Sequence, residues 1–566
     1  MKRKIIWLSL ISLSFSFGEF PIATSPYRDE DPKIACLGND LIVAYKTFGD
    51  GWNQVKVVRV NGLTGKKIWE KPVRDDSGQS EQQIVVDQKG KIWVVFKKYQ
   101  PEPWAIVLQR FTPDGVREFG PLGLEISSAE GHRYSPHLCL SSEGGVWVCW
   151  QDYRSDSLGN SPTIWCSYVA PQGQVTWTKM IGLGPAGHPI IVPTGDKAAL
   201  FWENFEDMQL PQMFCQVIDS AGKIYFPEGG KSLGVGLFPE IEPQLSILTV
   251  TSDSMNAFLV FLSSNTKRDI KMLEPGYARG QKIKDTLLLW EPEGVRIAYF
   301  DYYPHGFTLA PDFNGGLFIC WGKDNGYRGP DLYMQSIRSD ASLRFAQQGL
   351  KVWENYSIDS DDDIWMKTVN DGFGGIVVTW DTWSDSTEGD IIANRVDTLG
   401  NTLWGNGVRV CEAPQDQIHP EICRIDSNFI IVWQDERNGN WDIYAQSLDL
   451  NGNVGIGEKK RLESSSPIAL QIYPNPSCQF IDIKFQLLIP GYVTLKIYNV
   501  IGQEVRTLVS SSKKAGYYFL HWDRRNNYGK IIPSGIYLCE LKVRGDGRSL
   551  RIVKKIVLTR QRRDYE

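Results

Sequence analysis

The stretches VWVCWQDYR at residues 146–154 and FIIVWQDER at residues 429–437 are near copies of one pattern. Each is a short apolar run that ends in tryptophan and is followed by a polar Gln-Asp-x-Arg segment. Similar runs recur at intervals of 51 to 60 residues, and their terminal aromatic residues are Tyr45, Phe96, Trp150, Trp202, Phe261, Trp321, Trp380 and Trp433. Self-similarity at a period of about 55 residues is typical of a solenoid, a propeller or an array.

Two further landmarks keep phase with these runs. A proline precedes the aromatic residue by 13 or 14 positions at Pro32, Pro136, Pro189 and Pro420. A second apolar run then leads to a turn glycine, which is Gly65, Gly115, Gly173, Gly222, Gly294, Gly400 or Gly452. Four residues after the turn another aromatic residue recurs, namely Trp69, Phe119, Trp177, Phe226, Phe345 or Trp404, whereas Ala298 and Ile456 occupy the position in two weaker copies.

Each repeat is predicted to form four short antiparallel strands. Its runs are rich in β-branched and aromatic residues and are separated by turn residues. Radial repetition of such units describes a β-propeller. We therefore predict an all-β chain with a propeller of about eight four-stranded repeats over residues 28–457. Seven blades stay open as an alternative because the fifth copy is irregular, and a string of small β-sandwiches is disfavoured because 55 residues make a small independent core.

Composition excludes several classes of protein. The 566 residues are 42% hydrophobic and include 20 Trp, 23 Tyr and 24 Phe, which excludes a disordered chain. The formal net charge of −5 provides no general basic field for nucleic acid. No later apolar stretch is long enough for a transmembrane helix.

The N-terminus has the features of a secretory signal peptide. Lys2, Arg3 and Lys4 precede an apolar run from Ile5 to Phe17, which is too short to span a membrane comfortably. We expect a signal peptide at residues 1–18, with cleavage after Gly18. Export permits disulfides among the ten cysteines, although most of them lie inside apolar runs where cysteine behaves as a small hydrophobic residue. One or two bridges stay open, and the sequence does not pair them.

The period ends at a linker over residues 458–469. Beyond it, Ile481, Ile483 and Phe485 alternate with polar residues, and a similar alternation follows Val493 and Tyr537. About seven strands fit within residues 470–560. This predicts a small immunoglobulin-like β-sandwich.

Ordered motifs in this region carry a family resemblance. They are YPNP at residues 473–476, VTLKIYNVIG at residues 493–502, Trp522-Asp523, and PSGIY at residues 533–537. Together they resemble the type A C-terminal sorting domain of proteins secreted by the type IX system, which is similar to the immunoglobulin-like part of flagellar hook-capping proteins. The resemblance implies Sec export, passage through the outer membrane and then release or surface attachment. Arg524-Arg525 departs from the family pattern.

The acidic residues after the central strands are the best candidates for chemistry. Asp152 and Asp435 follow the repeated tryptophan, and related acids are Glu203, Asp324, Asp381, Asp331, Asp390 and Asp442. Oxygen-rich loops of this kind suit calcium, which is kept as an alternative cofactor. The favoured interpretation is structural, because the acid recurs with the repeat and the neighbouring Arg can form an ion pair with it. We assign no catalytic, cofactor-binding or metal-ligating residue, and no cofactor.

One segment within the fifth copy, between Phe261 and Gly294, is longer than its counterparts. The excess, around Ser263 to Thr286, contains six cations: Lys267, Arg268, Lys271, Arg279, Lys282 and Lys284. A basic loop is one interpretation, with an anionic glycan or protein as its ligand. A surface insertion without function is the favoured one.

The sequence predicts a secreted or surface-displayed binding module without catalysis. The alternative is an extracellular hydrolase or lyase that degrades polysaccharide or peptide at one propeller face. The expected partners are the type IX machinery and a glycan or protein ligand. We expect a monomer with no nucleic acid partner.

Overall fold

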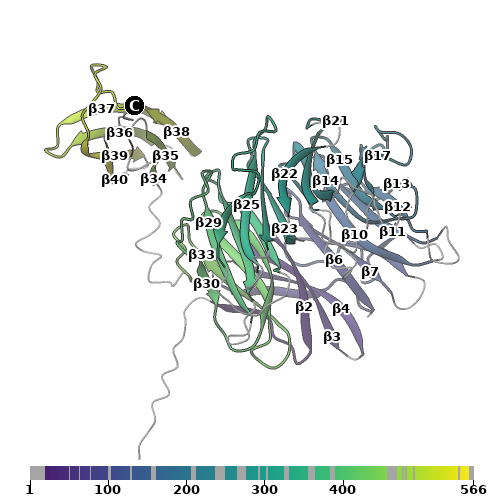
Figure 1. Ribbon diagram of the computed structural model, residues 1–566. Coiled ribbons are helices and arrows are strands. Elements are labelled where there is room, and N and C mark those ends of the chain that lie inside the picture. The colour runs from purple at the N-terminus through teal and green to yellow at the C-terminus, as the bar shows by residue number, and fades with distance from the viewer. Residues whose placement is uncertain are drawn as a thin grey trace, which may run out of the picture. The chain divides into compact units, whose positions relative to one another are not determined.

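The computed structural model describes residues 19–49, 51–62, 64–76, 78–99, 104–127, 131–154, 161–205, 212–235, 249–263, 276–290, 294–300, 304–323, 330–354, 364–382, 389–455, 468–473, 477, 481–487, 491–514, 516–545 and 548–559. Every regular element among them is a β-strand (Figure 1). Across these ranges no helix is long and apolar enough to cross a membrane. The chain divides into two units, residues 1–456 and 457–566.

The described residues of the first unit form eight antiparallel sheets, which we number as blades 1 to 8 in chain order. Blade 1 is β2 (Arg28–Leu37), β3 (Asp40–Gly49), β4 (Trp52–Asn61) and β5 (Lys67–Pro72); blade 2 is β6 (Gln79–Val86), β7 (Ile92–Lys98), β8 (Ala105–Phe111) and β9 (Leu124–Ser127); blade 3 is β10 (Arg133–Leu140), β11 (Val146–Asp152), β12 (Thr163–Val169) and β13 (Val175–Gly182); blade 4 is β14 (Ala186–Thr194), β15 (Lys197–Asn204), β16 (Gln212–Ile218) and β17 (Lys231–Val235). Blade 5 is β18 (Thr249–Ser252), β19 (Asn256–Ser263), β20 (Gly276–Lys284), β21 (Leu287–Leu288) and β22 (Val295–Phe300); blade 6 is β23 (Pro304–Pro311), β24 (Leu317–Lys323), β25 (Asp331–Ile337) and β26 (Leu350–Trp353); blade 7 is β27 (Met366–Asn370), β28 (Ile376–Thr382), β29 (Asp390–Val396) and β30 (Val408–Cys411); blade 8 is β31 (Gln417–Ile425), β32 (Asn428–Asp435), β33 (Asp442–Leu448) and β1 (Phe20–Ala23).

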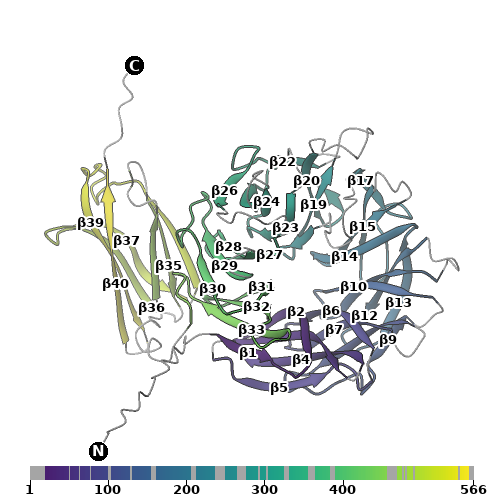
Figure 2. The same cartoon turned by 60° about the horizontal axis from the view of Figure 1, so that its bottom comes forward.

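The eight blades form a closed ring. The innermost strand of each blade contacts the innermost strand of the next, and β31 of blade 8 contacts β2 of blade 1 (Figure 2). The outermost strand of blade 8 comes from the other end of the sequence, because β1 pairs antiparallel with β33. The propeller prediction is thus confirmed with eight blades. The strand that closes the ring, β1, lies before residue 28, where the propeller was expected to begin.

Apolar residues fill the seams between blades. Trp150 shares an apolar cluster with Trp93 of blade 2, and Trp433 shares one with Val377 of blade 7. One further cluster joins blade 8 to blade 1 through Ile22, Val43 and other residues. The recurring aromatic residues of the second strands therefore lie between neighbouring blades, as expected, and each strand continues a few residues beyond its aromatic residue. Burying both faces of each sheet stabilises the ring.

The second recurring aromatic residue packs against the turn of the next blade. A Cβ placed on Gly115 would lie 2.8 Å from the Trp69 ring, and one placed on Gly452 would lie 2.8 Å from Trp404. Both glycines have positive φ, so the turn needs glycine for its backbone as well. In blade 8 the matching aromatic residue is Phe20, whose ring lies against Gly65 of blade 1. Ile456, to which the sequence assigned this position, lies outside the described residues.

A buried amide in the third strand holds that aromatic residue. Gln216 Oε1 accepts the amide N–H of Phe226 at 2.8 Å, and Gln335 Oε1 accepts that of Phe345 at 2.9 Å. In blade 5, Gln281 Oε1 accepts the Trp290 amide at 3.2 Å. Trp290, which is buried, thus occupies the position assigned from sequence to Ala298. The error arose because blade 5 turns at residues 285–286 without a glycine, directly after β20.

The second unit is a two-sheet sandwich with its own apolar core. One sheet is β34 (Ile468–Tyr473), β35 (Ile481–Leu487) and β38 (Gly516–Trp522), and the other is β37 (Glu504–Lys513), β36 (Gly491–Asn499), β39 (Gly535–Gly545) and β40 (Arg548–Leu558). The alternation noted in the sequence places Ile481, Ile483 and Phe485 in this core.

Candidate functional site

The innermost strands share a backbone irregularity near their N-terminal ends. A residue with φ between 51° and 59° lies within a register shift of the ladder in six blades: Asp31, Glu81, Ser135, His188, Gly306 and His419. In four of them the next residue is a landmark proline. We call the end of the ring where these bulges lie the loop end, because the connections between second and third strands also lie there. A bulge leaves backbone groups unpaired in the ladder, so they need other partners.

Side chains of neighbouring elements supply those partners. The Asp31 amide donates to Gln434 Oε1 at 2.6 Å, which joins blade 1 to blade 8. The His419 amide donates to Asp381 Oδ2 at 3.0 Å, which joins blade 8 to blade 7. Gln434 and Asp381 hold the same place, directly after the aromatic residue of the second strand. These polar residues therefore connect one blade to the next.

Asp381 is fully buried, and Oδ1 also accepts the Trp365 amide at 2.8 Å. Burial raises the pKa of Asp381 to about 7, and the amides oppose that rise. Burial also lowers the pKa of His137, on β10, to about 4. Neither side chain is positioned as an exposed acid or base.

Asp381 and His137 are expected to give opposite pH dependences of stability. The carboxyl pKa of Asp381 is raised, so its contribution declines as the pH rises from about 4 to about 7, by about 4 kcal/mol at most. The pKa of His137 is lowered, so its contribution is lost as the pH falls from about 6.5 to about 4. Between pH 4 and 8, Asp381→Asn should flatten the first slope of Tm and His137→Asn the second. Variant profiles parallel to that of the unmodified protein would contradict this assignment.

Charged side chains of blades 1, 7 and 8 meet near the ring axis. Lys33 Nζ lies 2.9 Å from Asp31 and 3.5 Å from Glu421, which in turn lies 3.3 Å from Lys367 Nζ. The positive charges of the two lysines balance the negative charges of the two carboxylates. This cluster fixes the inner strands where the ring closes.

The repeated aspartates are held by arginine and tryptophan. Asp152 is fully buried; its oxygens accept Trp150 Nε1 at 2.7 Å and Arg154 Nη2 at 2.6 Å, and Arg133 Nε lies 3.3 Å away. Asp435 repeats the arrangement with Trp433 Nε1 at 2.8 Å and Arg437 Nη2 at 2.6 Å. The contacts agree with the structural interpretation of these acids.

The other candidate acids also have partners. Glu203 Oε2 accepts a hydrogen bond from His188 Nδ1 at 2.9 Å, and this contact raises the pKa of His188. The remaining pairs are Asp331 with Lys351 at 3.1 Å, Asp390 with Arg409 at 2.6 Å, and Asp442 with Asn438 at 2.7 Å; Asp324 lies outside the described residues. Among the residues that the structure describes, no three His, Cys, Asp or Glu side chains are grouped to hold a metal ion.

Aromatic rings gather at the loop end between blades 2 and 3. Trp104 stacks on His132 with ring centroids 4.1 Å apart, and Tyr134 lies edge-on to Trp104 at 5.1 Å and to Tyr153 at 5.7 Å. We call these four residues the aromatic cluster. His132 is exposed and the other three are half-buried, so the cluster presents ring surface to solvent.

Two charged residues, Lys97 and Arg133, contact residues of the aromatic cluster. Lys97 Nζ lies 4.6 Å from the Tyr134 centroid and pairs with Glu81. Arg133 is fully buried and donates to the Trp104 carbonyl at 2.7 Å, while it also pairs with Asp152. Asp152, which was predicted to be structural, therefore helps to position the aromatic cluster through Arg133. The cluster itself was not predicted from the sequence, because its residues come from three separate segments.

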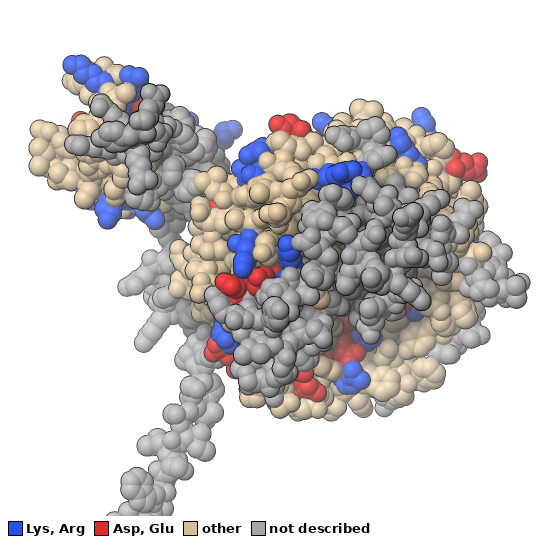
Figure 3. Space-filling view, in the orientation of Figure 1, with Lys and Arg blue, Asp and Glu red and all other residues tan. Residues whose placement is uncertain are grey.

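Part of the basic segment is a strand, not the projecting loop that was one interpretation of the sequence. Arg279 and Lys282 lie in strand β20 and are buried, and Lys282 Nζ donates to the Gly315 carbonyl at 2.6 Å. Lys267, Arg268 and Lys271 lie outside the described residues. On the face shown in Figure 3, the described acidic and basic residues are interspersed.

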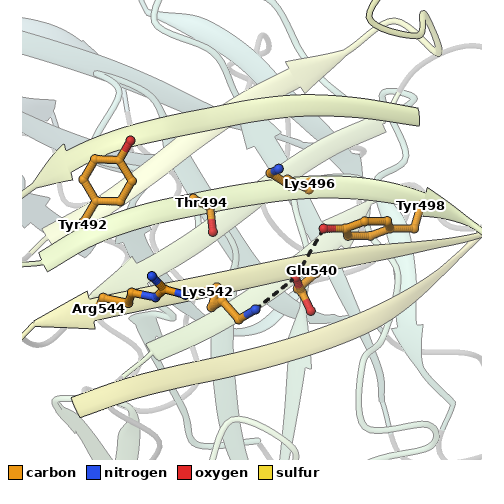
Figure 4. Close-up of a pocket in the computed structure, with 7 residues that line it drawn as sticks. All are labelled: Tyr492, Thr494, Lys496, Tyr498, Glu540, Lys542 and Arg544. Atoms are coloured by element: carbon orange, nitrogen blue, oxygen red, sulfur yellow. Dashed lines mark hydrogen bonds and ion pairs between the residues drawn. The ribbon is translucent and has the colours of Figure 1, made fainter. Parts of the chain in front are cut away.

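The solvent face of the second unit has a shallow hollow of about 230 Å³ on β36 and β39 (Figure 4). It is lined by Tyr492, Thr494, Lys496, Tyr498, Glu540, Lys542 and Arg544. Tyr498 and Lys542 point toward Glu540, at 3.5 and 3.8 Å. The alternate residues of both strands face the core, so the sandwich holds this polar face in place.

The motifs that suggested a family lie at turns of this sandwich. The Trp522 ring is buried and donates to the Arg525 carbonyl at 2.9 Å, and the Tyr537 hydroxyl donates to the Pro533 carbonyl at 3.0 Å. Residues 471–559 match the family model of the secretion system C-terminal sorting domain. The chain ends in a type IX sorting domain. The sorting domain engages the type IX machinery, and the protein is exported for secretion or attachment to the cell surface.

The sorting domain also accommodates its unusual arginine pair. Arg524 donates to the Ile532 carbonyl at 3.3 Å, and Arg525 donates to the Gly529 carbonyl at 2.6 Å. The departure from the family pattern is thus absorbed by contacts within the turn. YPNP is described only at Tyr473.

Comparison with other proteins gives distant similarities. No curated protein sequence matches the chain. Among solved structures, polysaccharide lyase Uly1 is similar over 75% of this chain and 90% of its own, at 11% identity and a TM-score of 0.39. PorZ of Porphyromonas gingivalis, a surface component of the type IX secretion system, is similar over 93% and 81%, at 10% identity and a TM-score of 0.23. An α-L-arabinofuranosidase of Fusarium graminearum covers 56% and 93%, at 13% identity and a TM-score of 0.32.

Proposed function

We propose that the protein is a non-catalytic carbohydrate-binding propeller that its sorting domain delivers to the cell exterior. The aromatic cluster carries this proposal. The C–H faces of sugar rings are apolar and pack against aromatic rings, while their hydroxyl groups hydrogen-bond with neighbouring polar groups. The cluster offers four rings, two of which carry a tyrosine hydroxyl, and the Lys97–Glu81 ion pair lies beside them.

Further exposed aromatic side chains lie at the loop end of blades 1 and 2. Trp52, which is 45% exposed, lies 6.5 Å from Tyr99 between ring centroids, and Tyr27 is also 45% exposed. Trp52 begins β4, Tyr99 follows β7 and Tyr27 precedes β2, and these strand ends lie at the loop end. Exposed aromatic surface of this kind marks an interaction site, and an extended glycan would use several such rings.

The charges support binding over catalysis. General acid–base chemistry needs a titratable group within reach of the reacting atom. The described candidate acids instead have arginine, lysine, histidine or asparagine partners, and Asp381 is buried away from solvent. In this proposal the paired acids stabilise the blades, and the rings of the aromatic cluster contact the ligand.

The test is binding of the purified full chain to a panel of neutral and uronic-acid-containing polysaccharides. Trp104→Ala should weaken retention about tenfold or more, because large aromatic residues dominate such contacts. Tyr528→Ala is the matched control: that ring is 88% exposed on the sorting domain, so retention should not change. Equal retention of both variants would contradict the proposal, as would no retention by the unmodified chain. Release of shortened products during incubation would instead support the hydrolase or lyase alternative.

A further inference from the structure

Two cysteines face each other across the closure of the ring. Cys36 lies on β2 of blade 1 and Cys423 on β31 of blade 8, the innermost strands that meet where the first and last blades join. Both pack against the same apolar cluster of this seam. Cys36 Sγ lies 3.8 Å from the carbonyl oxygen of Arg424, the residue that follows Cys423. The seam thus holds two half-buried thiols next to each other.

We propose that Cys36 and Cys423 form a disulfide after export, which locks blade 1 to blade 8. The bond would join the two ends of the propeller sequence at the place where closure otherwise depends on the four-residue strand β1, side-chain packing and the charges around Lys33. Exported bacterial proteins pass through a compartment in which disulfides form and persist.

The surroundings of the two sulfurs favour the reaction. A hydrogen bond from the Cys423 thiol lowers the pKa of Cys36, and the same contact with burial raises that of Cys423. The Cys36 thiolate would attack a sulfur of an oxidising protein disulfide, forming a mixed disulfide and expelling one thiolate of that protein. Cys423, losing its proton, would then attack Cys36 Sγ and expel the second thiolate. The two thiols lose two electrons and two protons, which the oxidising disulfide takes up as a dithiol.

A second pair of cysteines in the propeller is more deeply buried than Cys36 and Cys423. Cys149 and Cys166 are directly opposed in the middle of blade 3, and both are fully buried. Burial raises the pKa of each thiol. A buried, protonated thiol reacts slowly with an external disulfide, so we expect this pair to remain reduced. It serves as an internal control.

The test uses the full chain exported to an oxidising periplasm and purified without reductant. After free thiols are alkylated, non-reducing proteolysis should yield one peptide pair joined through Cys36 and Cys423. Cys149 and Cys166 should be alkylated once the chain is denatured. Separate alkylated peptides for Cys36 and Cys423 would overturn the proposal, and so would a bridge between either residue and another cysteine.

A stability measurement shows whether the disulfide stabilises the propeller or is only an oxidation product without effect on the fold. A crosslink that closes nearly the whole propeller restricts the unfolded chain, so reduction should lower Tm by several degrees. Cys36→Ser and Cys423→Ser should each lack this response, whereas Cys149→Ala should keep it. An equal response to reductant in Cys36→Ser and the unmodified protein would overturn the proposed role.

Discussion

Deletion of residues 467–566 is expected to trap the protein in the periplasm of its native host. The deletion removes the sorting domain matched at residues 471–559, through which the chain engages the type IX machinery. It leaves the propeller intact, because the blades bury their own apolar clusters. Fractionation should find nearly all of the shortened chain in the periplasm and little in the medium or on the surface.

Two controls make this result interpretable. Protease resistance of the trapped chain shows that the propeller is folded. Tyr528→Ala, a substitution at an exposed turn of the sorting domain, should reach the exterior at the normal level. Unchanged export of the shortened chain would contradict the assignment of sorting to this domain.

Asp152→Ala is expected to lower the free energy of unfolding by about 3–5 kcal/mol, the usual cost of breaking a buried ion pair. Asp152 and Arg133 are both fully buried and 3.3 Å apart, so the substitution leaves a buried guanidinium without its anion. Arg133 also bonds the Trp104 carbonyl, so the loss should extend to glycan retention. Chemical denaturation followed by tryptophan fluorescence measures the first effect.

Asp435→Ala is the matched control for this substitution. Its partner Arg437 is 20% exposed in its side chain and keeps a second anion, Glu19, at 2.7 Å. The destabilisation should therefore be smaller than for Asp152→Ala. In the Asp152→Ala background, Arg133→Met should recover part of the loss, because the buried charge is then gone. Equal effects of the two alanine substitutions would refute this ranking.

The propeller could be predicted because its determinants are local and repeated. Each blade needs an apolar second strand with a terminal aromatic residue, and eight copies make that requirement visible as a period. The sorting domain could be recognised for a similar reason: its turn residues occur in a fixed order. The irregular fifth blade was misaligned because Asp285-Thr286 replaces the glycine turn, and position-based counting then passed over Trp290.

The aromatic cluster could not be predicted in the same way. Trp104, His132, Tyr134 and Tyr153 come from two blades and three segments of the chain. Their proximity follows from the antiparallel register, which brings Arg133 opposite Asp152, and from packing between blades. The spacing of residues along the sequence does not indicate which residues of neighbouring blades are in contact.

Periodicity, apolar patterning and the ordered C-terminal motifs were enough to establish a repeat propeller, a separate sandwich and export by the type IX route, because each depends on residues close together in the chain. The closure of the ring was decided by tertiary structure. Phe20 completes blade 8 and Cys36 meets Cys423 because eight twisted sheets return the chain to its start, so residues some 400 positions apart become neighbours.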